Sequence, residues 1–430
     1  MPARLDTRSP DFDTKFKAFL GAKRESAQDV EAAVRDIIAD VATRGDAALI
    51  ELTRRFDRLD TDPAGLRVSP DELAAAAEQC EPRAVAALKL ARERIEAYHR
   101  RQLPKDERFT DALGVELGYR WTAISAAGLY VPGGTAAYPS SVLMNAVPAK
   151  VAGVPRLVMV VPAPDGRLNP LVLAAAHLAG VDEVYRIGGA QAVAALAYGT
   201  QSIRPVDKIV GPGNAYVAAA KRLVFGKVGI DMIAGPSEVL VLADDTANAS
   251  WIAADLLAQA EHDVAAQSIL ITDSADLADE VVAAVESQLQ TLPRAAVAGA
   301  SWRDFGTVIL VRRIEDALAL VDAIAPEHLE IVAADADALA EKVRNTGAIF
   351  IGGHTPEAIG DYVAGSNHVL PTARSARFSS GLGVYDFMKR TSILKCGPDQ
   401  LAALGPAAVA LGEAEGLHAH ARSVSIRLNR

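Results

Sequence analysis

The spacing of apolar residues changes near residue 113 from a helical period to a strand-like one. Before that point apolar residues recur every three to four positions, as on one face of a helix. These helical runs are Asp11 to Leu20, Val30 to Val41 and Ala84 to Tyr98. Two helix-start signals accompany them, Ser26 with Asp29 and Ser69 before Pro70. We find no catalytic grouping here, so the expected role is packing or oligomer contact.

From about Leu113, short apolar runs alternate with helical stretches. The first series predicts strands at 115–121, 128–131, 157–161, 183–187 and 208–210, with helices at 168–179, 190–198 and 214–225. The second series predicts strands at 239–242, 268–272, 307–311, 330–332 and 348–351, with helices at 247–261, 275–288, 314–323 and 336–343. Strands that alternate with helices form parallel sheets with right-handed crossovers.

After Gly353 the chain becomes polar and rich in loops, and two short helices within 398–413 precede a charged tail. This tail is too small to bury a core of its own, so we expect it to dock on another domain or protomer. The predicted fold class is α/β, with two tandem Rossmann-like parallel-sheet domains, a helical N-terminal segment and a small C-terminal tail domain.

Composition narrows the class of protein. The 430 residues carry a formal net charge of −10, which disfavours nucleic acid or an anionic membrane as the main partner. The residues before Phe12 lack an apolar signal segment, and no later run is long enough to span a membrane. The only cysteines, Cys80 and Cys396, are far apart, which excludes a disulfide framework and indicates a cytoplasmic protein.

Glycines mark three predicted strand ends, at 131–134, 187–191 and 210–214. The last two turns open into helices, whose N-terminal N–H groups suit anionic or polar ligands. Gly211 and Gly213 fit the first two glycines of a dinucleotide-binding turn, but Tyr216 stands where the third belongs. This glycine pattern is therefore compatible both with a dinucleotide-binding site and with tight structural turns.

Polar side chains end the apolar helix predicted at 247–261. Gln259 and His262 are three residues apart and would project from the same helix face. They form either a solvated helix end or half of a metal site. Glu327 beside His328, just before a predicted strand, supplies an acid–base pair if it lies in a cleft.

The remaining metal candidates come from distant segments. Asp361 lies in the loop-rich region, and Glu415 precedes His418 and His420 near the C-terminus. Together, Gln259, His262, Asp361 and His420 would offer the nitrogen and oxygen ligands that Zn²⁺ accepts. No local spacing demonstrates such a site, because its ligands belong to three separated segments.

Several segments, in order along the chain, resemble the L-histidinol dehydrogenase family. They are the turns at 188–191 and 211–214 and the segments 230–238, 257–263, 325–330, 365–372 and 415–420. This resemblance implies one zinc per site, held by Gln259, His262, Asp361 and His420. It also implies that His328 is the base for the alcohol and that Glu327 activates the water that attacks the aldehyde.

The resemblance further implies oxidation of L-histidinol through L-histidinal to L-histidine, with two NAD⁺ reduced, in histidine biosynthesis. Tyr130, Gln191 and Asn214 would contact NAD⁺. The implied substrate contacts are Ser237, Gln259, His262, His328, Asp361, Glu415 and His420. Family members are homodimers, so Glu415 and His420 would act in the partner's site.

The implied domains are an N-terminal arm at 1–25, a zinc domain at 26–129 plus 237–381, an NAD-binding domain at 130–236, and a tail domain at 382–430 that docks on the partner. Neither His418 nor His368 receives a role.

Alternative functions are a related zinc and NAD⁺ dehydrogenase for another small substituted alcohol, a zinc hydrolase in which Glu327 activates water, and a binding module without chemistry. The cysteine positions agree with a route that needs no thiol to hold an acyl group.

Overall fold

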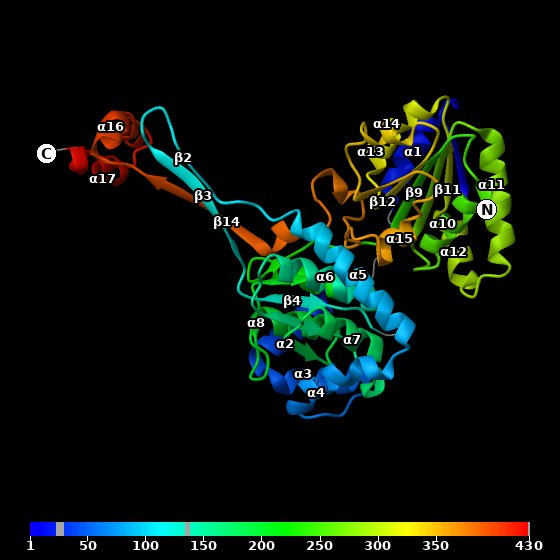
Figure 1. Ribbon diagram of the computed structural model, residues 1–430, viewed down its shortest axis with the longest axis horizontal. Coiled ribbons are helices and arrows are strands. Elements are labelled where there is room, and N and C mark those ends of the chain that lie inside the picture. Colours follow the sequence, from blue (N-terminus) through cyan, green and yellow to red (C-terminus); the bar gives the residue numbers. More distant parts are fainter. Residues whose placement is uncertain (23–29, 134–137, 429–430) are drawn as a thin grey trace.

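The computed structural model describes residues 1–22, 30–133 and 138–428. Two parallel sheets form the two halves of the molecule, and a narrow antiparallel arm extends from them (Figure 1). The predicted α/β class with two parallel-sheet domains is confirmed. Ser26, Asp29 and Gly134, which belong to a predicted cap and a predicted turn, lie outside the described residues.

The five-stranded domain is doubly wound, with strands in the order β6-β5-β4-β7-β8. Its strands are β4 (Ala127–Tyr130), β5 (Leu157–Val160), β6 (Glu183–Tyr185), β7 (Lys208–Val210) and β8 (Gly229–Ile230), connected in turn by α6 (Pro139–Val151), α7 (Pro170–Leu178), α8 (Gly189–Tyr198) and α9 (Ala215–Val224). Counted along the chain the order is 3-2-1-4-5, so the winding reverses between β4 and β7. Both strands β4 and β5 are buried along their whole length, as in a sheet covered on both faces.

The six-stranded domain repeats this winding and adds one edge strand, in the order β1-β11-β10-β9-β12-β13. Its strands are β1 (Ala3–Asp6), β9 (Glu238–Ala243), β10 (Gln267–Thr272), β11 (Thr307–Leu310), β12 (His328–Val332) and β13 (Ala348–Ile351). Its helices are α1 (Phe12–Gly21), α10 (Ala249–Ala260), α11 (Ala275–Leu289), α12 (Ala295–Phe305), α13 (Leu318–Ile324), α14 (Ala336–Ala340) and α15 (Glu357–Tyr362). Here the winding reverses between β9 and β12.

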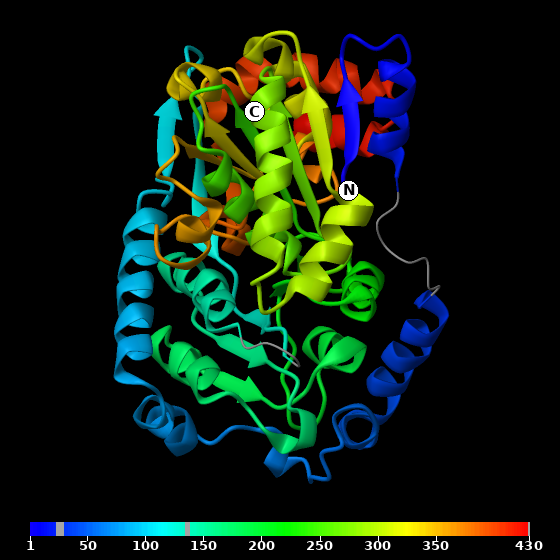
Figure 2. The ribbon, with the colours of Figure 1, turned by 90° about the vertical axis from the view of Figure 1, so that its right-hand side faces the viewer.

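The early helices pack on the five-stranded domain, which differs from the predicted division of the chain. They are α2 (Glu31–Arg44), α3 (Asp46–Asp57), α4 (Pro70–Ala75) and α5 (Pro82–Arg100). Val34 of α2 shares a core with Val158, and Ile95 of α5 shares another with Met144. Residues 30–129 therefore do not accompany 237–381, as Figure 2 also shows, where the helices after α1 lie along the lower domain. Apolar spacing defines the buried face of a helix but not the sheet that this face covers.

The predicted helical arm at 1–25 instead begins with a strand. Strand β1 pairs in parallel with β11, from Ala3 opposite Thr307 to Asp6 opposite Leu310. Its four residues include charged Arg4 and Asp6, and none of them is fully buried. A short polar edge strand has no apolar period of its own, which explains why the pattern missed it.

The arm consists of β2 (Glu107–Thr110), β3 (Glu116–Ala123) and β14 (Met388–Lys395), followed by α16 (Pro398–Ala414) and α17 (His418–Leu428). Strand β14 pairs antiparallel with β3 along its whole length. Figure 1 shows the terminal helices far from both parallel sheets. Leu394 and Leu411 on this arm are 70% and 65% exposed. The sequence predicted two short helices within 398–413, where the structure has the single helix α16. It predicted neither α17 nor β14, which has few buried positions.

The connection at 231–237 runs from the end of β8 to the start of β9. It brings the carboxyl-terminal edge of the five-stranded sheet to the amino-terminal edge of the six-stranded sheet. A further contact joins these edges, because Ser141 Oγ at the start of α6 lies 3.4 Å from His368 Nε2. The space between the two facing edges is where the candidate site lies.

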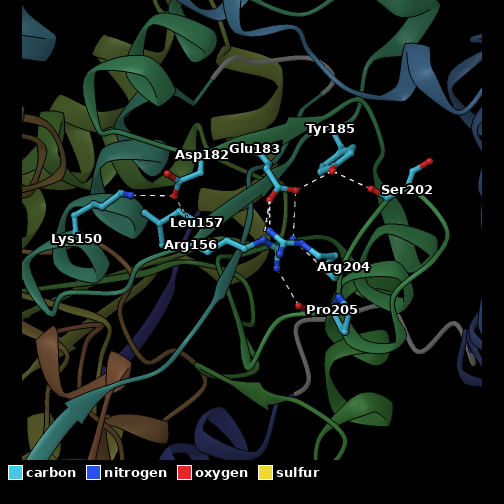
Figure 3. A network of polar contacts seen from close by, with 9 residues as sticks. All are labelled: Lys150, Arg156, Leu157, Asp182, Glu183, Tyr185, Ser202, Arg204 and Pro205. Atoms are coloured by element: carbon cyan, nitrogen blue, oxygen red, sulfur yellow. Dashed lines mark hydrogen bonds and ion pairs between the residues drawn. The ribbon is translucent and has the colours of Figure 1, made fainter.

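The opposite, amino-terminal edge of the five-stranded sheet is tied together by a polar network (Figure 3). Arg156 Nε donates to Glu183 Oε1 at 2.7 Å, and the Tyr185 hydroxyl donates to Glu183 Oε2 at 2.9 Å. Burial alone would raise the pKa of Glu183, but these two donors and the Arg156 charge lower it to about 2. This network is structural, because no candidate site residue lies within it.

Candidate active site

The predicted acid–base pair lies at the start of β12, beside the point where the winding of the six-stranded sheet reverses. Glu327 and His328 are only 6% and 4% exposed. Ala325, which ends α13, has a φ of 48° in the left-handed region that alanine rarely adopts. This turn directs the chain into β12 and delivers the pair to the amino-terminal edge of the sheet.

One hydrogen bond fixes the orientation of the His328 ring. Its Nδ1 lies 2.9 Å from the Glu238 carbonyl oxygen, which can only accept, so Nδ1 carries the proton. The opposite nitrogen, Nε2, is buried without a hydrogen-bond partner and lies 3.7 Å from Asp361 Oδ1. The imidazole thus directs Nε2 toward Asp361.

Carboxyl groups surround this imidazole. Glu357 Oε1 and Glu327 Oε2 lie 3.6 and 3.7 Å from His328 Nδ1. Burial alone would lower the pKa of His328, but Glu357, Glu327 and Asp361 raise it well above its usual value. Burial raises the pKa of Glu327 to about 7 and that of Glu357 to about 8. The pKa of each of these two carboxyl groups is therefore raised into the neutral range.

A second layer of carboxyl groups lies behind the first. Glu330 Oε1 accepts the backbone N–H of Glu357 at 2.5 Å and so holds the start of α15. Burial and the nearby Asp255 raise the pKa of Glu330 to about 9. Glu238 fixes the segment around Ala373, because its Oε1 accepts the Ala373 N–H at 3.0 Å. The backbone N–H of Glu238 donates to the Glu327 carboxyl group.

The structure brings three of the four predicted zinc ligands to this cluster. Gln259 is fully buried, and its amide nitrogen donates to Glu357 at 2.8 and 3.2 Å in the orientation that satisfies both groups. Asp361 interacts electrostatically with both His328 and His262. His262 was expected to share a helix face with Gln259 but lies in the turn just after α10. Its backbone nitrogen is 3.2 Å from the Gln259 carbonyl oxygen.

The fourth predicted ligand, His420, is not part of this cluster within one chain. His420 and Glu415 are exposed on the distant end of the arm, together with His418. Ser237 lies at the amino-terminal edge, where its carbonyl oxygen accepts the Gln267 N–H at 3.0 Å. His368, which had no predicted role, places Nδ1 3.0 Å from the Asp361 carbonyl oxygen and bridges it to Ser141.

The three predicted NAD⁺ contacts gather at the carboxyl-terminal edge of the five-stranded sheet. The Tyr130 hydroxyl accepts the Gly189 N–H at 3.0 Å, and burial raises the Tyr130 pKa to about 12. Gln191 is buried in the first turn of α8. Asn214 caps α9, since its Oδ1 accepts N–H groups of the first turn. All three lie at the ends of β4, β6 and β7, around the reversal of winding where doubly wound sheets bind ligands.

Sequence reasoning missed Glu357, although it is a member of the central cluster. The donor atoms of His328, Glu357 and Asp361 all lie within 4.8 Å of one another. Glu357 precedes Asp361 by four residues, so the two share one face of α15. This spacing could have indicated from the sequence that Glu357 joins Asp361 in the site. No sequence pattern indicated Glu330 or Asp255.

Comparisons with known proteins agree with this fold and site. A family model described as histidinol dehydrogenase matches residues 21–428. Histidinol dehydrogenases from Bradyrhizobium diazoefficiens and Rhodopseudomonas palustris are 75% and 74% identical to this chain, over 429 and 430 residues and 100% of both chains. A crystal structure of histidinol dehydrogenase from Elizabethkingia anophelis superposes with a TM-score of 0.94 at 36% identity, covering 99% of this chain and 98% of the other.

Two doubly wound domains around a buried imidazole–carboxyl cluster, together with these likenesses, define the chain as an oxidoreductase. It belongs to the histidinol dehydrogenase family. No helix in the described part of the chain is long and apolar enough to cross a membrane.

Proposed function

We propose that this enzyme oxidises L-histidinol through L-histidinal to L-histidine, transferring one hydride to each of two NAD⁺ and using one zinc ion per site. The observation that carries the proposal is the buried His328, whose Nε2 has no hydrogen-bond partner and whose Nδ1 lies 3.7 Å from Glu327 Oε2. Family membership supplies the substrate, and this geometry supplies the acid–base groups that the reaction needs.

His328 is the proposed base for the alcohol step. Its Nδ1 is engaged by the Glu238 carbonyl, which leaves Nε2 as the atom that accepts the hydroxyl proton while the hydride leaves carbon. The surrounding carboxyl groups stabilise the imidazolium that results. Because the ring is buried and held from one side, the accepting nitrogen has a fixed direction.

Glu327 is the proposed base for the aldehyde step. One of its oxygens accepts the Glu238 N–H at 2.9 Å, which fixes the carboxyl and leaves the other oxygen for a water molecule. Deprotonated water then adds to the aldehyde carbon, and the second hydride leaves from the hydrated carbon. A carboxyl with a pKa near 7 can take this proton at neutral pH.

Gln259, His262 and Asp361 fit zinc by the chemistry of their donors, which are an amide oxygen, an imidazole nitrogen and a carboxylate oxygen. Because the Gln259 nitrogen donates to Glu357, its oxygen remains available as a ligand. When bound, zinc would hold and orient the polar groups of the substrate and could polarise oxygen. A divalent cation would also offset the repulsion among the buried carboxyl groups.

NAD⁺ fits the carboxyl-terminal edge of the five-stranded sheet, where Tyr130, Gln191 and Asn214 meet. The N-termini of α8 and α9 point their N–H groups toward this edge, which suits phosphate. When bound there, NAD⁺ would supply the acceptor for each hydride, opposite the edge that carries His328.

We further propose that the enzyme is a homodimer in which the partner's arm completes each site. His420 and Glu415 lie far from the other proposed ligands of their own chain. The exposed Leu394 and Leu411 give the arm apolar surface to bury on a second copy. Ser237 and Glu415 would contact histidinol itself.

Adding L-histidinol and NAD⁺ to the zinc-loaded enzyme tests the proposal through absorbance of NADH. We expect two NADH for each histidine formed. NADH from another small amino alcohol but none from histidinol would favour a related dehydrogenase. Hydrolysis of an amide or peptide without NAD⁺ would favour a zinc hydrolase and overturn the proposal.

A further inference from the structure

Lys221 of α9 is a buried lysine within the five-stranded domain. It is only 2% exposed, although a lysine is almost never enclosed unless it is paired. Its ammonium forms an ion pair with Asp231, whose side chain is also buried. A buried pair of this kind is costly to desolvate and contributes little net stability, so its geometry calls for another explanation.

Both members of the pair hold the backbone of one residue, Gly211. Lys221 Nζ donates to the Gly211 carbonyl oxygen at 2.9 Å. The Gly211 N–H donates to Asp231 Oδ2 at 2.7 Å. The peptide groups on either side of Gly211 are therefore fixed by charged partners from α9 and from the segment after β8, so the turn after β7 is held from two directions.

This turn is pressed against the strand that carries Tyr130. Gly211 has a φ of 109°, and a Cβ atom there would lie 2.2 Å from the Tyr130 carbonyl oxygen. Three residues further on, Asn214 caps α9. The pair thus fixes the position of the turn that lies between two of the proposed NAD⁺ contacts, Tyr130 and Asn214.

We propose that Lys221 and Asp231 are positioning residues for NAD⁺ binding, acting through the Gly211 turn. This inference rests on the proposed function, because it takes NAD⁺ as the ligand of that edge. The pair is directed at the cofactor and not at zinc or histidinol, since Gly211 follows β7 of the five-stranded sheet, whereas Gln259, His262 and Asp361 lie on the other domain.

The principal test is the double variant Lys221→Met/Asp231→Asn in the full-length enzyme. It removes both charges together, so that no unpaired charge remains buried, and keeps an amide oxygen for the Gly211 N–H. The Kd of NAD⁺ is measured by fluorescence titration in the absence of histidinol, alongside zinc content and the KM values for NAD⁺ and histidinol. We expect the NAD⁺ Kd and KM to rise about 10- to 100-fold, with zinc content unchanged and the KM for histidinol within about twofold of wild type.

The matched control is a second largely buried ion pair of the same domain, Arg156 with Glu183, at the opposite edge of the sheet (Figure 3). The control variant Arg156→Met/Glu183→Gln should lower thermal stability and leave the NAD⁺ Kd unchanged. Equal weakening of NAD⁺ binding in both double variants would overturn the inference, because the effect would then be general destabilisation.

A wild-type NAD⁺ Kd in the Lys221/Asp231 double variant would also overturn the inference, as would a parallel rise in the KM for histidinol. If that variant does not fold, the single variant Lys221→Arg decides. Its guanidinium keeps the charge and differs in shape, so we expect a folded protein with a raised NAD⁺ Kd, and an unchanged Kd would reject the inference. Failure of the wild-type enzyme to bind NAD⁺ would instead reject the proposed function.

Discussion

The two parallel sheets have the same winding, yet they present opposite edges to the candidate active site. The five-stranded sheet uses its carboxyl-terminal edge, where Tyr130 and the glycine turns lie, as doubly wound sheets usually do. The six-stranded sheet uses its amino-terminal edge, where Glu238 and His328 begin their strands. The winding order of a sheet therefore does not by itself indicate which edge carries function. The connection at 231–237 decides it here, because it leads from the end of one sheet directly to the start of the other.

The two edges also differ in their electrostatics. At the five-stranded edge the buried charges of Lys221 and Asp231 cancel each other, and the N-termini of α8 and α9 lie at this edge. At the six-stranded edge the carboxyl groups outnumber the cations, and burial raises the pKa of Glu327, Glu357 and Glu330 to about 7, 8 and 9. One edge is thus suited to an anionic cofactor and the other to a cation and to proton transfer.

The substitution His328→Asn, at the six-stranded edge, should have the largest effect and tests the proposed difference between the two edges most directly. Loss of the accepting nitrogen should lower kcat by about 10²- to 10⁴-fold, measured as NADH formation from histidinol. Zinc content and the NAD⁺ Kd should match wild type, because His328 is not a proposed ligand of either. Loss of zinc in this variant would contradict the division of roles.

His262→Asn tests the zinc half of the same edge. Removing a proposed ligand should weaken zinc binding by at least about 100-fold and abolish turnover with it. Zinc is measured by atomic emission after dialysis. A variant that retains stoichiometric zinc would show that His262 does not bind the metal.

Glu327→Gln separates the two oxidation steps. The amide cannot accept a proton from water, so the rate with histidinal should fall about 10²-fold or more, whereas the release of the first NADH from histidinol should fall less. Single-turnover absorbance with each substrate measures this. Equal losses in both steps would end the assignment of Glu327 to water activation.

A mixture of two inactive variants tests the proposed role of the arm. Asp361→Asn and His420→Asn each remove one proposed ligand, and mixed dimers would contain one site in which both native residues meet. Mixing under subunit exchange should restore a fraction of wild-type activity, up to about one quarter on statistical grounds. Continued inactivity, with exchange verified by light scattering of tagged subunits, would place both ligands in one chain.

The smallest expected effect lies at the edge that takes no part in the site. Glu183→Gln should lower the free energy of unfolding by about 1–3 kcal/mol at pH 7, measured by urea titration. The pKa of Glu183 is lowered on folding, so its contribution is present above the unfolded value near 4.5 and is lost as pH falls toward 2. The difference between variant and wild type should therefore narrow at pH 4, with kcat unchanged at pH 7.

The sequence by itself determined the elements and their alternation. Strand β7 matches its predicted range, and β9, β10 and α8 agree within one residue at each end, because apolar period and capping residues act locally. Helix α4 begins as predicted, with the Ser69 side chain accepting the Glu72 N–H. Family resemblance, carried by the order of motifs along the chain, was also readable and is confirmed.

The tertiary structure alone decided how these elements meet. It assigned α2 to α5 to the five-stranded domain and separated His420 from Gln259 by the length of the arm. It also placed Glu330 beside Glu357 and enclosed Lys221 with Asp231. The physical reason is that local spacing fixes the face of a helix or strand on which a side chain lies. The partner across that face depends on sheet order and packing between distant segments.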